Sequence, residues 1–172
     1  GTQLSNKKLG IIGYGRIGKN IARLAKQFKF DIFINDTNYK LKKKILKAGY
    51  KFVSKKHIYK STDFLCLAVN LNETSHHMIG RKEFDQMKRN LILINISRGP
   101  VIDEYYLIKA LKNKKISGAG LDVFENEPLK RNNKLRKMDN CILSAHNSFN
   151  TIETSSQTND SSIKNLIKGL KK

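Results

Sequence analysis

The chain has 172 residues, of which 39% are hydrophobic and 28% are charged, and its formal net charge is +20. This length allows one domain with a buried core, and no run approaches the roughly 18 consecutive apolar residues of a membrane-spanning helix. The lysines are spread along the chain and form no basic tract, which favours a solvated surface over a nucleic-acid partner.

The two cysteines exclude a disulfide scaffold and a cysteine-based metal centre. Cys66 and Cys141 both lie in apolar stretches that are typical of strands, and no C-x-x-C spacing occurs. No signal-peptide pattern opens the chain. We therefore predict free thiols, a cytoplasmic location and no metal site.

The first part of the chain alternates strand-like and helix-like segments. An apolar, β-branched run ends at Gly13 and predicts a strand, after which apolar residues recur at helical spacing. This helix is expected to bury one apolar face, formed by Ile17, Ile21, Leu24, Ala25 and Phe28. The predicted segments are a strand over 8–12, this helix, a strand over 31–35, a basic helix over 41–48 and a short strand over 51–54.

The second part continues the alternation. Continuous apolar runs over 64–69 and 91–96 predict strands buried on both faces, and Asp103 can cap a helix over 104–112. Strands alternating with helices predict an α/β fold, a Rossmann-type doubly wound parallel sheet in three α/β/α layers, with a single domain over residues 1–172. The remaining predictions are a loop over 70–75, a helix over 81–88, a turn over 97–100, strands over 118–123 and 141–144, and a helix late in 151–170.

A glycine motif directly follows the first predicted strand. Residues 13–18 read Gly-Tyr-Gly-Arg-Ile-Gly and match G-x-G-x-x-G between a strand and an amphipathic helix. In a dinucleotide-binding turn, Gly13 permits the tight turn, Gly15 lets the backbone approach a pyrophosphate, and Gly18 lets the helix pack on the strand. The helix N-terminus offers N–H groups to the phosphates. Such glycines also serve as ordinary turn residues, but the flanking strand and helix favour the cofactor interpretation.

Asp36 is the acidic partner that this motif requires. It ends the second predicted strand about 20 residues after the glycines, where a carboxylate accepts hydrogen bonds from the adenosine ribose. A carboxylate there repels a 2′-phosphate, so NAD is favoured over NADP. The alternative is that Asp36 only starts a turn with Thr37 and Asn38.

Arg98, Glu127 and His146 each follow a predicted strand, where ligands of an open parallel sheet bind. A guanidinium can grip a substrate carboxylate, and a carboxylate beside a histidine keeps it protonated for acid catalysis. The structural alternatives are a surface ion-pair partner for Arg98, a solvated loop acid for Glu127 and a turn residue for His146. We predict that the other histidines lie at the surface: His57, His76 and His77.

Together these motifs resemble the D-isomer-specific 2-hydroxyacid dehydrogenases. Residues 1–18 are similar to the family's entry into its cofactor domain, and residues 91–99 look like its arginine motif. Residues 120–129 look like its glutamate motif, and residues 144–146 like its histidine motif. The blocks occur in the family's order and span nearly all of the chain.

The resemblance implies an NAD-dependent oxidoreductase that interconverts a small D-2-hydroxy acid and its 2-keto acid by hydride transfer. In this sequence His146 would be the acid/base, with Glu127 rather than Glu125 as its partner, and Arg98 would orient the keto acid. Asp122 would hydrogen-bond the nicotinamide carboxamide. The cofactor-binding residues implied are Gly13, Gly15, Arg16, Ile17, Gly18, Asp36 and Asp122.

The sequence also departs from the family's pattern. Ala145 and Asn70 stand where the family commonly has proline, which removes backbone stiffness but no reacting group. The family also places a substrate domain and a long connecting helix ahead of the residues that match Gly1. We therefore expect this chain to bind NAD but to turn over keto acids feebly or not at all without that part, and expect a homodimer for the full-length protein.

Two functions remain open from the sequence. Within the dehydrogenase class, a phosphoglycerate dehydrogenase-like enzyme is the leading hypothesis. The alternative is an NAD-sensing, corepressor-like binding module without turnover, which could keep the same motifs, and the charge of +20 leaves nucleic-acid contact as a weaker third hypothesis. Titrations with NADH and with labelled DNA at about 0.15 M salt would separate them.

Overall fold

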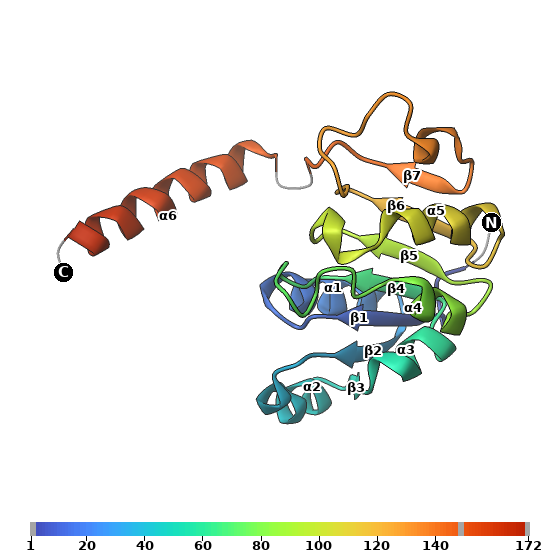
Figure 1. Ribbon diagram of the computed structural model, residues 1–172. Helices are drawn as coiled ribbons and strands as arrows, with labels where there is room; N and C mark the ends of the chain where they lie inside the picture. The colour runs from blue at the N-terminus through green and yellow to red at the C-terminus, as the bar shows by residue number, and fades with distance from the viewer. Residues whose placement is uncertain (1–2, 148–149, 171–172) are drawn as a thin grey trace.

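A seven-stranded, all-parallel sheet forms the centre of the computed structural model, which describes residues 3–147 and 150–170. The strands follow the order β3-β2-β1-β4-β5-β6-β7, so the chain starts mid-sheet, builds one edge and then the other (Figure 1). This is the doubly wound Rossmann order extended by one strand. The strands are β1 (Lys8–Ile12), β2 (Asp31–Asn35), β3 (Lys51–Phe52), β4 (Phe64–Leu67), β5 (Ile92–Asn95), β6 (Gly118–Leu121) and β7 (Cys141–Leu143).

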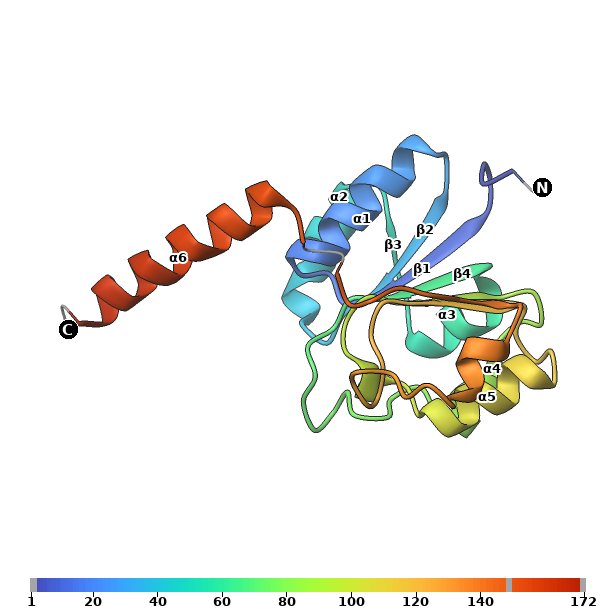
Figure 2. The same cartoon turned by 90° about the horizontal axis from the view of Figure 1, so that it is seen from above.

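Helices cover the sheet on both faces, which confirms the predicted three-layer α/β fold. Figure 2 shows α1 and α2 on one face of the sheet and α3, α4 and α5 on the other. The helices are α1 (Arg16–Gln27), α2 (Lys42–Lys47), α3 (Lys55–Ser61), α4 (Arg81–Gln86), α5 (Glu104–Lys112) and α6 (Ile152–Leu170), with 3-10 turns η1 (Tyr39–Leu41), η2 (Gly99–Val101) and η3 (Lys134–Lys137).

The segment after β3 differs from its prediction. The sequence predicts a strand over 51–54, but β3 ends at Phe52 and α3 begins directly afterwards. Ser54 caps this helix, because its hydroxyl oxygen accepts a hydrogen bond from the His57 N–H at 3.2 Å. The helix then buries Ile58 and Tyr59 while it carries the chain to the opposite face of the sheet.

The first helix forms where it is predicted but buries a different face. Gly18, Ala22 and Ala25 are its buried residues, because small side chains let the helix axis approach the sheet closely. The predicted apolar face is therefore wrong in part. Three of its members are more than half exposed: Ile17, Leu24 and Phe28.

The sheet face that carries α1 becomes more exposed toward β7. Paired residues of parallel strands point to the same side, so Ile11, Cys66, Ile94, Gly120 and Ile142 form one row. Ile11 and Cys66 are buried, Ile94 is half-buried and Ile142 is 78% exposed. In the described part of the chain, the helices on this face lie over the first three strands. β5, which was predicted to be buried on both faces, is therefore well covered on one.

The last helix leaves the body of the domain (Figure 1). α6 fills nearly all of the segment in which a helix was predicted, and none of its residues is buried. Within residues 3–147 and 150–170, neither this helix nor any other is long and apolar enough to cross a membrane.

Candidate active site

The turn between β1 and α1 has the shape predicted for a phosphate cradle. Gly13 has φ of 96°, in the left-handed region, and a Cβ there would clash with the Ala68 carbonyl oxygen. A Cβ at Gly18 would clash with the Gly13 carbonyl oxygen. The first glycine therefore permits the turn, and the last lets α1 pack against β1.

Gly15 has a different role, because its neighbourhood is empty. A Cβ at Gly15 would meet no atom within 4 Å. The residue lines a groove of about 260 Å³ together with Gly13, Asp36, Asn70 and Thr74. The open space over Gly15 lies beside the N-terminus of α1, where backbone N–H groups attract anions. The residues present therefore fit a dinucleotide whose pyrophosphate lies over Gly15.

Asp36 lies in the same groove, at the end of β2. Its Oδ2 accepts a hydrogen bond from the Tyr14 N–H at 2.7 Å, and its Oδ1 accepts one from the Asn38 N–H at 2.7 Å. The carboxylate thus links the glycine turn to the turn after β2. Since a carboxylate offers about four lone-pair positions, both oxygens keep capacity for a ribose hydroxyl.

His146 and Glu127 form a hydrogen-bonded pair. The His146 Nδ1 lies 2.7 Å from the Glu127 Oε2, and the Glu127 Oε1 accepts a hydrogen bond from the Phe124 N–H at 2.9 Å. His146 has φ of 53°, an uncommon value for a residue other than glycine. Backbone of this kind persists where the surroundings hold it, and it is frequent at functional sites.

The surroundings of Glu127 favour its ionised form. Burial opposes ionisation, but the Phe124 N–H, the His146 ring and the charge of Arg98 outweigh it and lower the pKa of Glu127. A negative Glu127 is a strong hydrogen-bond acceptor for the imidazole. Sequence reasoning anticipated this pair, and the charge of Arg98 acts on the same carboxylate.

Arg98 is held by the turn that follows β5. The buried Asn95 accepts hydrogen bonds from the Ser97 N–H and hydroxyl, and its amide donates to the Arg98 carbonyl oxygen at 3.0 Å. Gly99 packs so tightly that a Cβ there would clash with the Phe124 carbonyl oxygen. The arginine turn therefore rests directly on the segment that leads to Glu127.

The other predicted cofactor residues are not all in the groove. The buried Asp122 lies beyond β6, where its Oδ1 accepts a hydrogen bond from the Asn147 N–H at 3.3 Å. This contact places it beside the His146 loop. Arg16 and Ile17 begin α1 and do not line the groove with their side chains, so only their backbone lies in the phosphate cradle.

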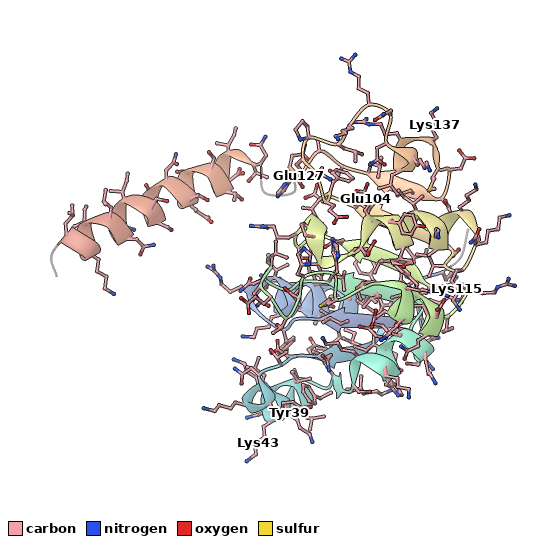
Figure 3. All side chains as sticks on the ribbon, in the orientation of Figure 1. Tyr39, Lys43, Glu104, Lys115, Glu127 and Lys137 are labelled. Carbon is pink, nitrogen blue, oxygen red and sulfur yellow. The ribbon has the colours of Figure 1, made fainter. Side chains whose placement is uncertain are left out.

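A second cavity lies beside the histidine pair. It measures about 610 Å³ and is lined by residues that include Glu127, His146, Phe124 and Arg136. Glu127 lies on the side of the domain from which α6 leaves (Figure 3).

His77 is partly exposed, but it has a partner that the sequence did not indicate. The His77 Nε2 lies 2.6 Å from the Glu125 Oε1, and both side chains are about one-third exposed or less. Asn95 was also missed as an organiser of the arginine turn. Its signal was a polar amide at the end of an apolar strand, whereas nothing local to His77 indicates a partner 48 residues away.

Comparison with known proteins agrees with this geometry. The family model for the NAD-binding domain of D-isomer specific 2-hydroxyacid dehydrogenases matches residues 1–148. A glyoxylate reductase of Korarchaeum cryptofilum is 40% identical over 169 residues, which are 97% of this chain and 50% of the relative. The chain spans about half the length of the curated relatives it matches.

Solved structures give the same result. A glyoxylate reductase from Paecilomyes thermophila matches with a TM-score of 0.91 and 34% identity, over 100% of this chain and 52% of that one. A D-isomer specific 2-hydroxyacid dehydrogenase from Lactobacillus delbrueckii ssp. bulgaricus, in its NAD complexed form, matches with a TM-score of 0.83 and 28% identity, over 98% and 55%.

Proposed function

The chain belongs to the D-isomer specific 2-hydroxyacid dehydrogenase family, as its NAD-binding domain, and we propose that it carries the cofactor and acid/base half of such an enzyme. The reaction would interconvert a small D-2-hydroxy acid and its 2-keto acid. The observation that carries the proposal is the 2.7 Å contact between His146 Nδ1 and Glu127 Oε2, with Arg98 close enough to lower the pKa of Glu127.

In this proposal His146 transfers the proton. Glu127 binds the imidazole through Nδ1 and fixes the orientation of the ring. The other ring nitrogen, Nε2, then donates its proton to the keto oxygen during reduction and accepts it back from the hydroxyl during oxidation.

Arg98 binds the acid in this proposal. A guanidinium pairs with a carboxylate through two parallel hydrogen bonds, which orients the keto group as well as neutralising the charge. Its Nη1 donates to the Ser97 carbonyl oxygen at 2.7 Å, so the direction of the side chain is restrained by its own turn.

The glycine turn, the backbone of Arg16 and Ile17, Asp36 and Asp122 would hold the nicotinamide cofactor. NADH, when bound, supplies the hydride. Asp36 favours NAD(H), because its carboxylate accepts from a ribose hydroxyl and repels a 2′-phosphate.

A fluorescence titration with NADH and NADPH tests the binding step on the chain alone. We expect NADH to bind and NADPH to bind at least about tenfold more weakly, a difference of about 1.4 kcal/mol. Equal affinity for the two would contradict the assignment of Asp36.

A chimaera tests the chemistry, because this chain spans only half of its relatives. It would replace the matching half of the glyoxylate reductase of Thermococcus litoralis, which is 43% identical over 167 residues. We expect NADH oxidation with glyoxylate or hydroxypyruvate, and a loss of about 10²–10⁴-fold in kcat for His146→Gln. An unchanged rate in His146→Gln would remove His146 from the reaction.

The activity of the chain alone is a separate part of the proposal. We propose that residues 1–172 act as one domain that binds NADH without efficient turnover. Steady-state oxidation by this chain alone at about one per second or faster, within the usual range for enzymes, would contradict it.

The partners and location of the complete protein are also proposals. The exposed apolar residues of α1 and β7 support a protein interface and hence a homodimer, which sedimentation of the complete protein tests. Both cysteines are free thiols, which is consistent with the cytoplasmic location that we propose.

A further inference from the structure

A second histidine–carboxylate contact lies behind the proposed acid/base pair. The His77 Nε2 lies 2.6 Å from the Glu125 Oε1, and its Nδ1 lies 3.9 Å from an oxygen of Asp103. The Glu125 Oε2 accepts a hydrogen bond from the Glu104 N–H at 3.1 Å, at the N-terminus of α5. We call the His77–Glu125 contact, with its anchor on α5, the clasp.

The clasp joins two loops that the proposed function uses separately. His77 lies in the loop after β4, whose residues Asn72, Thr74 and Met78 line the cofactor groove. Glu125 lies between Phe124 and Glu127 in the loop after β6, and the Phe124 N–H donates to Glu127. A single hydrogen bond therefore connects the wall of the cofactor groove to the segment that holds Glu127.

The backbone around His77 is held as firmly as its side chain. The His77 N–H donates to the Pro100 carbonyl oxygen at 2.7 Å, and Ile79 and Ile102 form a parallel bridge. His77 has φ of 48°, which places its ring toward Glu125 at some backbone cost. Strain of this kind persists only where the contacts on both sides offset it.

We propose that His77 and Glu125 are positioning residues, which fix the Glu127 loop against the cofactor groove and thereby set the geometry of the His146–Glu127 pair. Glu125 is immobilised from two directions, by the His77 ring and by the Glu104 N–H. With Glu125 held, Phe124 is restrained on one side and Gly99 packs on its carbonyl oxygen from the other. The role as a positioning pair rests on the proposed function. The coupling of the His77–Glu125 contact to the Glu127 loop does not depend on that function.

The test compares His77→Asn, Glu125→Gln and the control His76→Asn. Asparagine tolerates the left-handed region, so His77→Asn removes the contact with Glu125 without adding backbone strain. His76 is the adjacent histidine, and its exposed ring is tilted by 30° relative to that of His77, with the centroids 4.1 Å apart. Glu125→Gln keeps the shape of the side chain and answers the same question if His77→Asn does not fold.

The primary measurement is the pKa of Glu127 in the nucleotide-free chain, from carboxyl ¹³C chemical shifts. We expect it to rise toward its ordinary value in His77→Asn and Glu125→Gln, because the Phe124 N–H and the His146 ring are no longer held on the carboxylate. The control should keep the wild-type value. We also expect the effects of the two single variants not to add in full in the double variant, because they share the His77–Glu125 contact.

The second measurement is NADH affinity, which we expect to fall about three- to tenfold in both clasp variants and to stay unchanged in the control. A purely structural role would lower the melting temperature while leaving the Glu127 pKa and the NADH affinity of the folded protein at wild-type values, and that result overturns the proposal. If the wild type itself does not bind NADH, the proposed function fails, but the pKa measurement still decides the coupling.

Discussion

The three glycines of the motif have different surroundings in the structure. Gly13 and Gly18 have no room for a Cβ, whereas Gly15 has nothing within 4 Å of one. These surroundings agree with the separate roles that the motif predicts: Gly13 and Gly18 are needed for folding, and Gly15 leaves open space. This difference allows binding and stability to be tested independently.

Gly15→Val should leave the free energy of unfolding within about 0.5 kcal/mol of the wild type, as for a surface substitution. Its φ of −74° is a value that any residue adopts. NADH affinity should fall at least about tenfold, or about 1.4 kcal/mol, because the new side chain fills the space for the pyrophosphate. Urea unfolding and a fluorescence titration check the two parts. Full affinity in a folded Gly15→Val protein would contradict the phosphate cradle.

Asp63 provides a test of electrostatics away from the candidate site. Its Oδ1 lies 2.6 Å from Lys88 Nζ, and its Oδ2 accepts the Lys8 N–H at 2.9 Å. Burial disfavours the charge, but the Lys88 hydrogen bond, the Lys8 N–H and the Lys88 charge outweigh it and lower the pKa of Asp63. At neutral pH we expect Asp63→Asn to lose about 1–3 kcal/mol, as for a hydrogen bond to a charged group.

The pH dependence of that loss has a definite sign. A carboxyl whose pKa is lower in the folded state adds stability above its unfolded pKa of about 4, and this stability disappears as the pH falls through the lower, folded pKa. The wild type and Asp63→Asn should therefore converge in stability at acid pH. Unfolding curves measured from neutral pH downward check this, and a gap that widens in acid would show that another interaction carries the effect.

At the scale of elements, local patterns located most of the structure. Apolar runs predicted β1, β2, β4 and β7 well, and Asp103 caps α5 as expected, accepting the Tyr106 N–H at 3.2 Å. α3 was missed because its seven residues show no clear apolar period and only its Ser54 cap marks the start. The buried face of α1 was mispredicted because close packing on the sheet selected small residues over large apolar ones.

In the candidate site, too, local patterns predicted some residues, whereas others depend on tertiary packing. The residues at strand ends could be found from sequence, because the carboxyl ends of parallel strands share one edge. The role of His77 could not, since its partner Glu125 lies 48 residues away and is brought to it by how two loops pack together. Local periodicity carries no information on such contacts.

Gly99 and Gly120 form a matched pair for testing how loops pack. A Cβ at Gly99 would clash with the Phe124 carbonyl oxygen, whereas one at Gly120 would meet nothing within 4 Å. We expect Gly99→Ala to cost about 1–3 kcal/mol as overpacking and Gly120→Ala to cost less than about 0.5 kcal/mol. Guanidinium unfolding of both variants measures the difference. Equal stabilities would mean that the arginine turn moves freely relative to the Glu127 segment.

On the scale of the whole molecule, the cofactor groove and the histidine pair both lie at the carboxyl ends of the strands. A ligand that contacts both should therefore stabilise the entire fold. At about 100 times its dissociation constant, NADH adds about 2.7 kcal/mol. For a domain of this size, that corresponds to a rise of about 5–10 °C in melting temperature. Differential scanning fluorimetry with and without NADH measures it. No rise at saturating NADH would indicate that the nucleotide binds the unfolded chain equally well or does not bind.

The exposed end of the sheet row at Ile142 should affect how the isolated chain self-associates. Exposed apolar side chains such as Ile142 favour association between copies of the chain. Copies that each carry a charge of +20 also repel one another at long range. Added electrolyte shortens that repulsion from a Debye length of about 30 Å at 0.01 M to about 3 Å at 1 M. Light scattering from the isolated chain should therefore grow with ionic strength, and Ile142→Lys should suppress the growth.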